Sequence, residues 1–328
     1  MKFLETDISP LGMGCWPIGG AMYAGDQPLG YTNTNDADSI RTIHAALASG
    51  ITLFDTAPAY GAGHAERLLS RALRGRPEAL IVTKIGTGID EQTRQITADE
   101  TDPASVLPAI DQSLSRLGRD RIDLLLLHLN SLPVAQAEAI FDEVEEACKA
   151  GKVRSYGWST DFTQSATAFS GRRNFVAIEH AMNVLLDAPD MQKVIHGSSL
   201  LALIRSPLAM GLLGGNYGAT DVMRPDDIRA TSNPRTAYFA NGRPNPAFLA
   251  RLDAVRELLT SDGRSLVQGA LGWLWAKGDT NIPIPGARTV EQIEGIAGAL
   301  AFGPLPGAVM AQIEALITLD PDSAAQAR

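Results

Sequence analysis

Cysteine is scarce in this chain. Only Cys15 and Cys148 occur among the 328 residues, and no Cys-x-x-Cys pair is present. Proteins that depend on a disulfide framework carry many cysteines for their length, whereas proteins of reducing compartments do not need them. The shortage therefore excludes a disulfide framework and predicts a cytoplasmic protein.

Basic clusters and long apolar runs are also missing. The formal net charge is −9, and no segment is rich in Lys and Arg. Because surfaces that bind nucleic acid are basic, we expect no nucleic-acid partner. No uncharged apolar stretch approaches the ~20 residues that span a bilayer. Residues 1–5 already include an acidic residue, and no long apolar segment of a secretory signal follows. We therefore expect neither a membrane anchor nor export.

Motifs of several other enzyme classes are absent. Residues 12–17 (GMGCWP) come nearest to Gly-x-Gly-x-x-Gly but fail at the last position, which excludes a Rossmann dinucleotide site. No Gly-x-Ser-x-Gly and no P-loop occurs, so hydrolase and kinase functions have no support. The histidines other than His128 share no metal-ligand spacing, and no metal site is predicted. Glu66, near a predicted helix start, is expected to act as a cap or to contact the helix dipole.

Apolar runs alternate with amphipathic helical patterns along the chain. The predicted strands cover residues 11–15, 51–55, 79–85, 122–128, 154–159, 175–179, 200–206 and 281–285. Helices are predicted at 36–49, 64–74, 103–117, 134–150, 161–169, 190–197, 265–277 and 289–300. Eight strands that alternate with helices favour a parallel sheet closed into a (β/α)8 TIM barrel. We therefore expect the α/β class and a single domain over residues 1–328.

Several segments fall outside this repeat. Accessory helices are predicted at 246–260 and 305–318, and residues 1–9 are expected to cover the barrel floor. The stretches 20–35 and 214–245 are polar and rich in turn-forming residues, and loops of such length are usually functional or disordered. We expect both long loops over the C-terminal rim of the barrel, and a frayed tail at 322–328.

Three of the predicted strands deliver an ionisable side chain near their C-terminal ends. Asp55 ends the first of these runs, and Tyr60 follows it in a short loop. Lys84 stands near the end of the next run, and His128 ends the third. The carboxyl ends of the strands build the active site of a closed parallel barrel. These four side chains are therefore predicted to meet at one rim.

The order and spacing of these four residues closely resemble the aldo-keto reductase family. Further matches are residues 151–159 (GKVRSYGWS), 206–208 (SPL) and 284–288 (IPGAR), and the resemblance runs from about residue 8 to about residue 300. It implies a catalytic tetrad of Asp55, Tyr60, Lys84 and His128.

The resemblance also implies what each member of the tetrad does. Tyr60 would protonate the alkoxide that forms when a carbonyl group is reduced, although a free tyrosine has a pKa near 10. Lys84, held by Asp55, is expected to lower that pKa. His128 would orient the substrate oxygen, and Trp16, Tyr60 and His128 would bind the substrate. For any one residue alone the alternative is structural: an Asp55–Lys84 ion pair and a core histidine.

The cofactor implied by the resemblance is NADP(H), with NAD(H) as the second choice, bound across the barrel mouth. Ser159 and Glu179 are expected at the carboxamide of the nicotinamide, although the family usually has Gln where Glu179 stands. Arg205 is expected to stack on the nicotinamide or to pair with a phosphate or carboxylate. Arg288, where a helix opens, is expected at the 2′-phosphate. Further expected cofactor contacts are Gly14, Cys15, Trp16, Asp55, Thr160, Ser206, Pro207, Leu208, Gly211, Gly286 and Gln292.

The predicted activity is the interconversion of a small carbonyl compound and an alcohol. Two alternatives stay open. One is a sugar or aldose dehydrogenase that uses NAD in the oxidative direction, and the other is a nucleotide-sensing subunit that resembles potassium-channel β subunits. The intact tetrad favours an enzyme. The physiological substrate, the direction of the reaction and the oligomeric state are not encoded in any motif of the chain.

Overall fold

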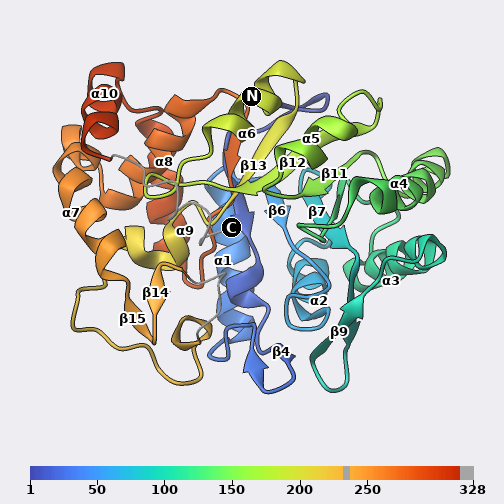
Figure 1. Cartoon of the computed structure of the whole chain (residues 1–328). Coiled ribbons are helices and arrows are strands. Elements are labelled where there is room, and N and C mark those ends of the chain that lie inside the picture. The colour runs from blue at the N-terminus through green and yellow to red at the C-terminus, as the bar shows by residue number, and fades with distance from the viewer. Residues whose placement is uncertain (232–236, 318–328) are drawn as a thin grey trace.

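A closed barrel of eight parallel strands forms the centre of the computed structural model, which describes residues 1–231 and 237–317 (Figure 1). The strands are β3 (Gly12–Gly14), β6 (Leu53–Asp55), β7 (Leu80–Ile85), β10 (Leu124–Leu127), β11 (Tyr156–Ser159), β12 (Phe175–Ala181), β13 (Leu201–Arg205) and β16 (Asn281–Pro283). They pair in chain order, and the amide of Gly14 donates to the carbonyl of Pro285 over 3.0 Å, which joins the first strand to the last. The predicted (β/α)8 barrel is confirmed.

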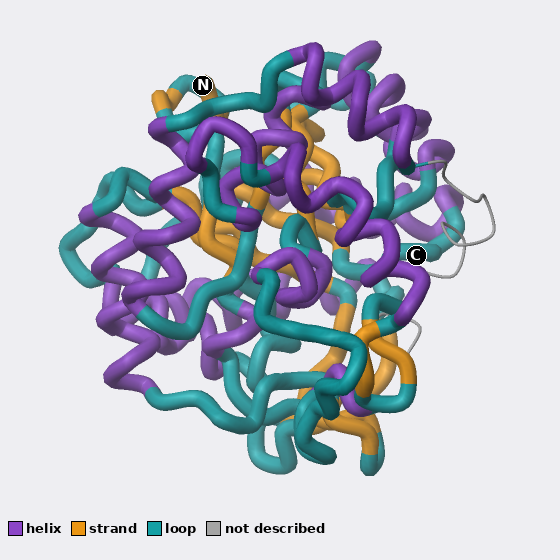
Figure 2. Tube along the Cα trace, turned by 90° about the vertical axis from the view of Figure 1, so that its left-hand side faces the viewer, coloured by secondary structure: helices purple, strands orange, loops and turns teal. Residues whose placement is uncertain are grey.

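Helices surround the strands, as the tube in Figure 2 shows. Within the described residues the helices of the repeat are α1 (Asp36–Ala48), α2 (His64–Ala72), α3 (Val106–Leu117), α4 (Val134–Lys149), α5 (Thr163–Ala168), α6 (Pro189–Gly197), α8 (Leu266–Lys277) and α9 (Val290–Ala297). The accessory helices are α7 (Pro246–Leu259) and α10 (Gly307–Leu316), as predicted. Side chains fix several helix starts. Asn35 accepts from the first amides of α1, and Ser265 forms a capping box with Gln268 at α8.

The interior of the barrel is apolar at the end that lies near the N terminus. One cluster contains the inward-facing residues Leu53, Leu80, Val82, Leu124, Leu126, Ala177, Leu203, Ile282 and Ile284. An antiparallel hairpin of β1 (Lys2–Phe3) and β2 (Thr6–Asp7) adds Phe3 and Ile8 to this cluster, and Phe3 is 0% exposed. The prediction that residues 1–9 cover the barrel floor is confirmed.

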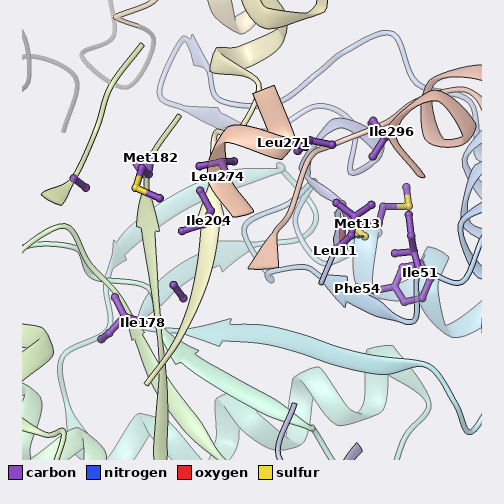
Figure 3. Close-up of a cluster of buried hydrophobic side chains, with 14 of the residues drawn as sticks. Leu11, Met13, Ile51, Phe54, Ile178, Met182, Ile204, Leu271, Leu274 and Ile296 are labelled. Atoms are coloured by element: carbon purple, nitrogen blue, oxygen red, sulfur yellow. Dashed lines mark hydrogen bonds between the residues drawn. The ribbon is translucent and has the colours of Figure 1, made fainter. Parts of the chain in front are cut away.

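A larger apolar core lies between the strands and the helices (Figure 3). Phe54 of β6 faces this outer core together with Leu271 of α8 and Ile296 of α9. Successive residues of a strand point to opposite faces, so Phe54 points outward while Leu53 and Asp55 point inward. The same short strands therefore serve two cores.

Two small sheets lie at the end of the barrel away from the N terminus (Figure 1). The strands β4 (Tyr23–Ala24), β5 (Gln27–Pro28), β8 (Thr87–Asp90) and β9 (Gln95–Asp99) form one sheet, and β14 (Phe239–Ala240) pairs with β15 (Arg243–Pro244). Neither sheet was predicted from the sequence, because the strands are short and their pairing is set by distant segments. The hydroxyl of Thr32 donates to Asp226 Oδ2 over 2.7 Å, so the two predicted long loops meet across this rim.

Other boundaries move by only a few residues. The helix predicted at 289–300 is α9, which ends at Ala297 and continues as a 3-10 turn over Gly298–Ala301. The predicted frayed tail at 322–328 lies outside the described residues. Over residues 1–231 and 237–317, no helix is both long enough and apolar enough to cross a membrane.

Candidate active site

Ionisable side chains from separate strands meet inside the rim end of the barrel. Asp55 lies two residues beyond the inward-facing Leu53 of β6. Lys84 lies two residues beyond the inward-facing Val82 of β7, and Glu179 occupies an inward position of β12. Because the side-chain period of a strand is two, the apolar interior passes directly into a layer of charged groups.

Lys84 is the centre of this layer. Its Nζ lies 2.6 Å from Asp55 Oδ2 and 3.2 Å from Glu179 Oε2, and its side chain is 0% exposed. The ammonium also donates to the carbonyl of Thr56 over 3.1 Å and to the hydroxyl of Tyr60 over 3.4 Å. Two buried carboxyl groups therefore share a single ammonium.

Burial and neighbouring charges decide where protons reside in this cluster. Burial, followed by Glu179, raises the pKa of Asp55 well above its usual range in spite of Lys84. Burial also acts to raise the pKa of Glu179, but Lys84 and then His128 outweigh it and lower that pKa. For Lys84, burial is outweighed by Asp55 and Glu179, which raise its pKa. These directions favour a charged Lys84 and make Asp55 the more basic of the two carboxyl groups.

Tyr60 stands at the edge of this cluster, in the turn that follows β6. The ammonium of Lys84 lies 5.2 Å from the centroid of its ring. Burial raises the pKa of Tyr60 and outweighs the lowering effect of Lys84. Lys84 thus acts in the expected direction on this pKa, but burial has the larger effect. Tyr60 keeps its proton at neutral pH, which is the state that a proton donor needs.

Aromatic side chains border Tyr60. The ring of Trp16 lies 6.3 Å from that of Tyr60 and 5.4 Å from that of Tyr31, measured between centroids. Trp16 Nε1 donates to the carbonyl of Leu29 over 3.0 Å, which fixes the indole. The ring of His128 meets Tyr60 edge-on at 6.3 Å. The structure thus brings the three predicted substrate residues together and adds Tyr31, whose pKa burial raises to about 12.

Ser159 and Glu179, both predicted at the nicotinamide, are in direct contact. The hydroxyl of Ser159 donates to Glu179 Oε1 over 3.0 Å. The neighbouring Thr160 is buried, and its hydroxyl donates to the carbonyl of Asn130 over 2.7 Å. The side chain of Thr160 is therefore already occupied, whereas Glu179 Oε2 is buried and lies 3.2 Å from the Lys84 ammonium.

Arg205, at the end of β13, forms an ion pair with Asp161. The other carboxylate oxygen of Asp161 accepts from the amide of Ala181 over 2.8 Å, so Asp161 holds Arg205 against the barrel. Of the predicted options for Arg205, the structure contains the pairing with a carboxylate. Its contact with a cofactor stays a prediction.

An unusual turn follows Arg205. Ser206, Ala209, Met210 and Gly211 all have positive φ, with Gly211 at 97°. Pro207 is buried and Leu208 is partly buried beside the 3-10 segment Ala209–Gly214. Left-handed conformations are costly for residues other than glycine and tend to gather at binding sites. This turn places the predicted residues 206–208 and 211 together at the rim.

Arg288 lines a cleft of about 180 Å³ where α1 and α9 begin. The other lining residues are Pro17, Ile18, Asn33, Thr34, Asn35, Asp38, Ser39 and Thr289. The amide of Arg288 donates to Gln292 Oε1 over 2.8 Å, which engages the Gln292 side chain at the helix start. Within residues 1–231 and 237–317, no salt bridge is formed by the Arg288 guanidinium, so its charge is available to a ligand.

Gly14, Cys15 and Gly286 lie at the seam where the barrel closes. A Cβ atom on Gly14 would lie 2.6 Å from the carbonyl oxygen of Ile284, and one on Gly286 would lie 2.4 Å from Pro17 Cγ. Packing of the seam therefore accounts for both glycines. The Cys15 side chain is fully buried in the outer core, so its backbone alone can meet a ligand at the rim.

Glu66 stands in the first turn of α2, where a carboxylate favours the helix dipole as predicted, but it also has structural partners. Its side chain is 0% exposed, accepts from the hydroxyl of Thr83 over 2.7 Å and pairs with Arg116 Nε over 2.5 Å. It therefore also ties α2 to β7 and α3. Among the described residues, no group of three metal-ligating side chains exists.

Two contacts of the site, those of Glu179 with Lys84 and of Asp161 with Arg205, were not predicted from the sequence. The inward position of Glu179, in step with Ser159 on the paired strand, was the available signal for its contact with Lys84. Asp161 carried none, because its pairing with Arg205 joins segments 44 residues apart.

The fold and the site together define a class of protein. A (β/α)8 barrel with its ionisable residues at the carboxyl ends of the strands is the architecture of a barrel enzyme. The model of the Aldo/keto reductase family matches residues 10–318. The chain belongs to this family and is an oxidoreductase.

Individual relatives agree with this assignment. Aldo-keto reductase YhdN of Bacillus subtilis is 29% identical over 301 residues, which cover 89% of this chain and 85% of that protein. Aldo-keto reductase yakc of Schizosaccharomyces pombe, whose name specifies NADP(+), is 26% identical over 91% of this chain and 86% of its own length. The structure of glycerol dehydrogenase AKR11B4 from Gluconobacter oxydans aligns with a TM-score of 0.79 at 27% identity and covers 97% of this chain and 96% of that one.

Proposed function

We propose that this protein is an NADP(H)-dependent enzyme that interconverts an aldehyde or ketone and an alcohol, with Tyr60 as the proton donor. The proposal rests on one observation above all. The Tyr60 hydroxyl lies 3.4 Å from the buried Lys84 ammonium and beside Trp16 and His128. A protonated phenol next to a fixed positive charge suits transfer of a proton to a developing alkoxide.

The residues of the rim fit a nicotinamide dinucleotide. Near Lys84, Glu179 is a buried carboxylate that lies 3.2 Å from the ammonium, and a carboxylate suits an amide donor such as a carboxamide. At the cleft, Arg288 combines a guanidinium that forms no salt bridge with the described residues with the N-terminus of α9, which suits a phosphate. The NADP(+) in the name of the yakc relative supports the choice of cofactor, with NAD(H) second.

The bound nicotinamide supplies a hydride for reduction and accepts one in oxidation. The protein supplies the proton and the orientation. Tyr60 gives its proton to the carbonyl oxygen as negative charge grows there, and Lys84 stabilises the phenolate that remains. Asp55 and Glu179 hold Lys84 in place, at 2.6 and 3.2 Å. His128 and Trp16 confine the carbonyl group against Tyr60. In oxidation the phenolate takes the hydroxyl proton back.

Turnover measurements test the proposal. NADPH oxidation would be followed with a panel of aldehydes and ketones, and NADP+ reduction with a panel of alcohols and sugars. We expect saturable turnover that is faster with NADP(H) than with NAD(H) and that is lost in Tyr60→Phe. Turnover with NAD+ and sugars alone would favour the dehydrogenase alternative. Tight cofactor binding without turnover of any panel member would favour the nucleotide-sensing alternative.

The oxidative direction has a specific observation in its favour. The glycerol dehydrogenase that aligns with nearly the whole chain is named for the oxidation of a polyol. We therefore propose polyols as the first members of the alcohol panel. Equal rates with simple monohydric alcohols of the same size would argue against a polyol preference.

A further inference from the structure

With Glu179 included, the buried cluster contains two carboxyl groups but only one amine. A single Asp55–Lys84 pair would be neutral, but the three side chains together would carry a net charge of −1 if both acids were ionised. Their side chains are 3%, 2% and 0% exposed for Asp55, Glu179 and Lys84. A net charge buried in this way is costly, which favours retention of one proton by the cluster.

The groups around Glu179 come from several strands and from the turn after β6, where Tyr60 interacts with both Glu179 and Lys84. Lys84 faces it from β7 and Asp55 from β6, while Ser159 of β11 contributes an uncharged hydroxyl. His128, which follows β10, and Arg205 of β13 also act to lower the pKa of Glu179. Arg205 is already paired with Asp161. Of these side chains, Lys84 alone is in direct ionic contact with Glu179, and Asp55 shares that same cation.

We propose that Asp55 and Glu179 act as an acid pair that releases its shared proton when the oxidised, cationic nicotinamide binds and keeps it when the reduced, neutral form binds. This inference rests on the proposed function. Charge then balances in both complexes, because the positive ring replaces the proton in one and the proton remains in the other. Glu179 is a positioning residue in this scheme, and it links the redox state of the cofactor to the protonation of the cluster.

Cofactor affinities measured against pH test the link without any turnover. The dissociation constants of NADP+ and NADPH would be measured between roughly pH 5.5 and 8.5, and their ratio cancels the titration of the 2′-phosphate that both share. For one linked proton, the preference of wild type for NADP+ should rise with pH, by up to about tenfold per pH unit. In Glu179→Gln the ratio should be independent of pH. Calorimetry in two buffers of different ionisation enthalpy should count about one proton released with NADP+ and none with NADPH.

Matched variants separate this pair from other groups. Glu66→Gln removes another buried glutamate outside the site and should keep the wild-type pH dependence. Asp55→Asn removes the other half of the pair and should abolish the pH dependence, which gives a second test should Glu179→Gln fold poorly. A ratio that is flat in wild type, or that still changes with pH in Glu179→Gln because His128 is responsible, would overturn the inference. Failure of both nucleotides to bind wild type would instead overturn the proposed function.

Discussion

The two halves of the barrel interior are built by the same strands but have opposite character. Toward the floor, Leu53 and Val82 pack around Phe3 in a purely apolar cluster. Two residues farther along the same strands, Asp55 and Lys84 form a buried ionic cluster with Glu179. Two residues along a strand thus separate the half that stabilises the barrel from the half that we propose carries its chemistry.

The energetics of the two halves differ in kind. Apolar burial at the floor contributes about 25 cal/mol for each Å² removed from water. A buried ion pair is weak evidence of stability, because desolvation offsets most of the attraction between the charges. Substitutions at the rim are therefore expected to reduce activity and leave the fold intact. Substitutions at the floor are expected to destabilise the fold and leave activity intact. The predictions below test that division, from the largest expected effect to the smallest.

The largest effect should come from Tyr60→Phe. Removing the hydroxyl removes the proton donor, and general acid catalysis contributes typically 10²–10⁴-fold, so the rate of carbonyl reduction should fall by that range. The free energy of unfolding should change by less than about 1 kcal/mol, because one hydrogen bond is lost. Single-turnover reduction and urea unfolding measure the two quantities.

Tyr156→Phe is the matched control for Tyr60→Phe. The Tyr156 hydroxyl donates to Glu145 over 2.8 Å on the outer side of the barrel, so its loss should leave the reduction rate unchanged. Reduction by Tyr60→Phe at near the wild-type rate would show that the proton comes from elsewhere.

At the floor, Phe3→Ala should produce the opposite result. The side chain is fully buried inside the barrel, and truncation of a core Phe costs about 3–5 kcal/mol of unfolding free energy. The turnover number measured well below the unfolding temperature should match wild type, because Phe3 touches no residue of the rim cluster. Lys2→Ala, an exposed change in the same hairpin, should cost less than about 1 kcal/mol. A large fall in turnover in Phe3→Ala would mean that the two halves are coupled.

The floor and the ionic cluster at the rim were predicted from the sequence for the same physical reason. A strand buried on both faces appears as a continuous apolar run, so an ionisable residue at its end is conspicuous, and Asp55, Lys84 and His128 were found in this way. The order of elements then predicted the barrel. Residues 1–9 were placed correctly because they lie outside the repeat.

Features that depend on distant partners could not be predicted in this way. The contact of Glu179 with Lys84 exists only because the closed barrel brings β12 opposite β7. Glu66 reads as a helix-start residue until Arg116 and Thr83 are placed against it. The lowering effect of Lys84 on the pKa of Tyr60 was predicted, but the net direction also depends on burial, which a sequence does not quantify.

A third prediction concerns the outer edge of the rim, where charge is free instead of buried. Arg288→Ala should raise the dissociation constant of NADPH by roughly ten- to a hundredfold and leave that of NADH nearly unchanged, since a hydrogen bond to a charged group contributes about 1.5–3 kcal/mol. Fluorescence titration measures both constants. Arg41→Ala, an exposed arginine of α1 paired with Asp38, is the control and should alter neither. Equal weakening of both nucleotides would place Arg288 away from the 2′-phosphate.

The smallest expected effect is the pH dependence of the free energy of unfolding. It distinguishes the rim from the floor most directly. The pKa of Asp55 is raised in the folded protein, so above the ordinary pKa of aspartate, about 3.9, the folded state binds more protons than the unfolded state. The stabilisation is complete below that pKa, and the free energy of unfolding should fall as pH rises through the folded pKa, by at most about 1.4 kcal/mol per pH unit for one proton. The lowered pKa of Glu179 acts with the opposite sign, but only where the pH falls below its ordinary range.

Urea unfolding of wild type between roughly pH 5 and 8 should therefore show a decline that Glu179→Gln flattens, because the second carboxylate no longer raises the pKa of Asp55. Phe3→Ala should show the wild-type slope at a lower overall stability, since it alters the floor and leaves the acid pair intact. If Glu179→Gln keeps the full slope, the proton is not shared between Asp55 and Glu179. If Phe3→Ala loses it, the apolar half of the barrel controls the protonation of the ionic half, and the division between them fails.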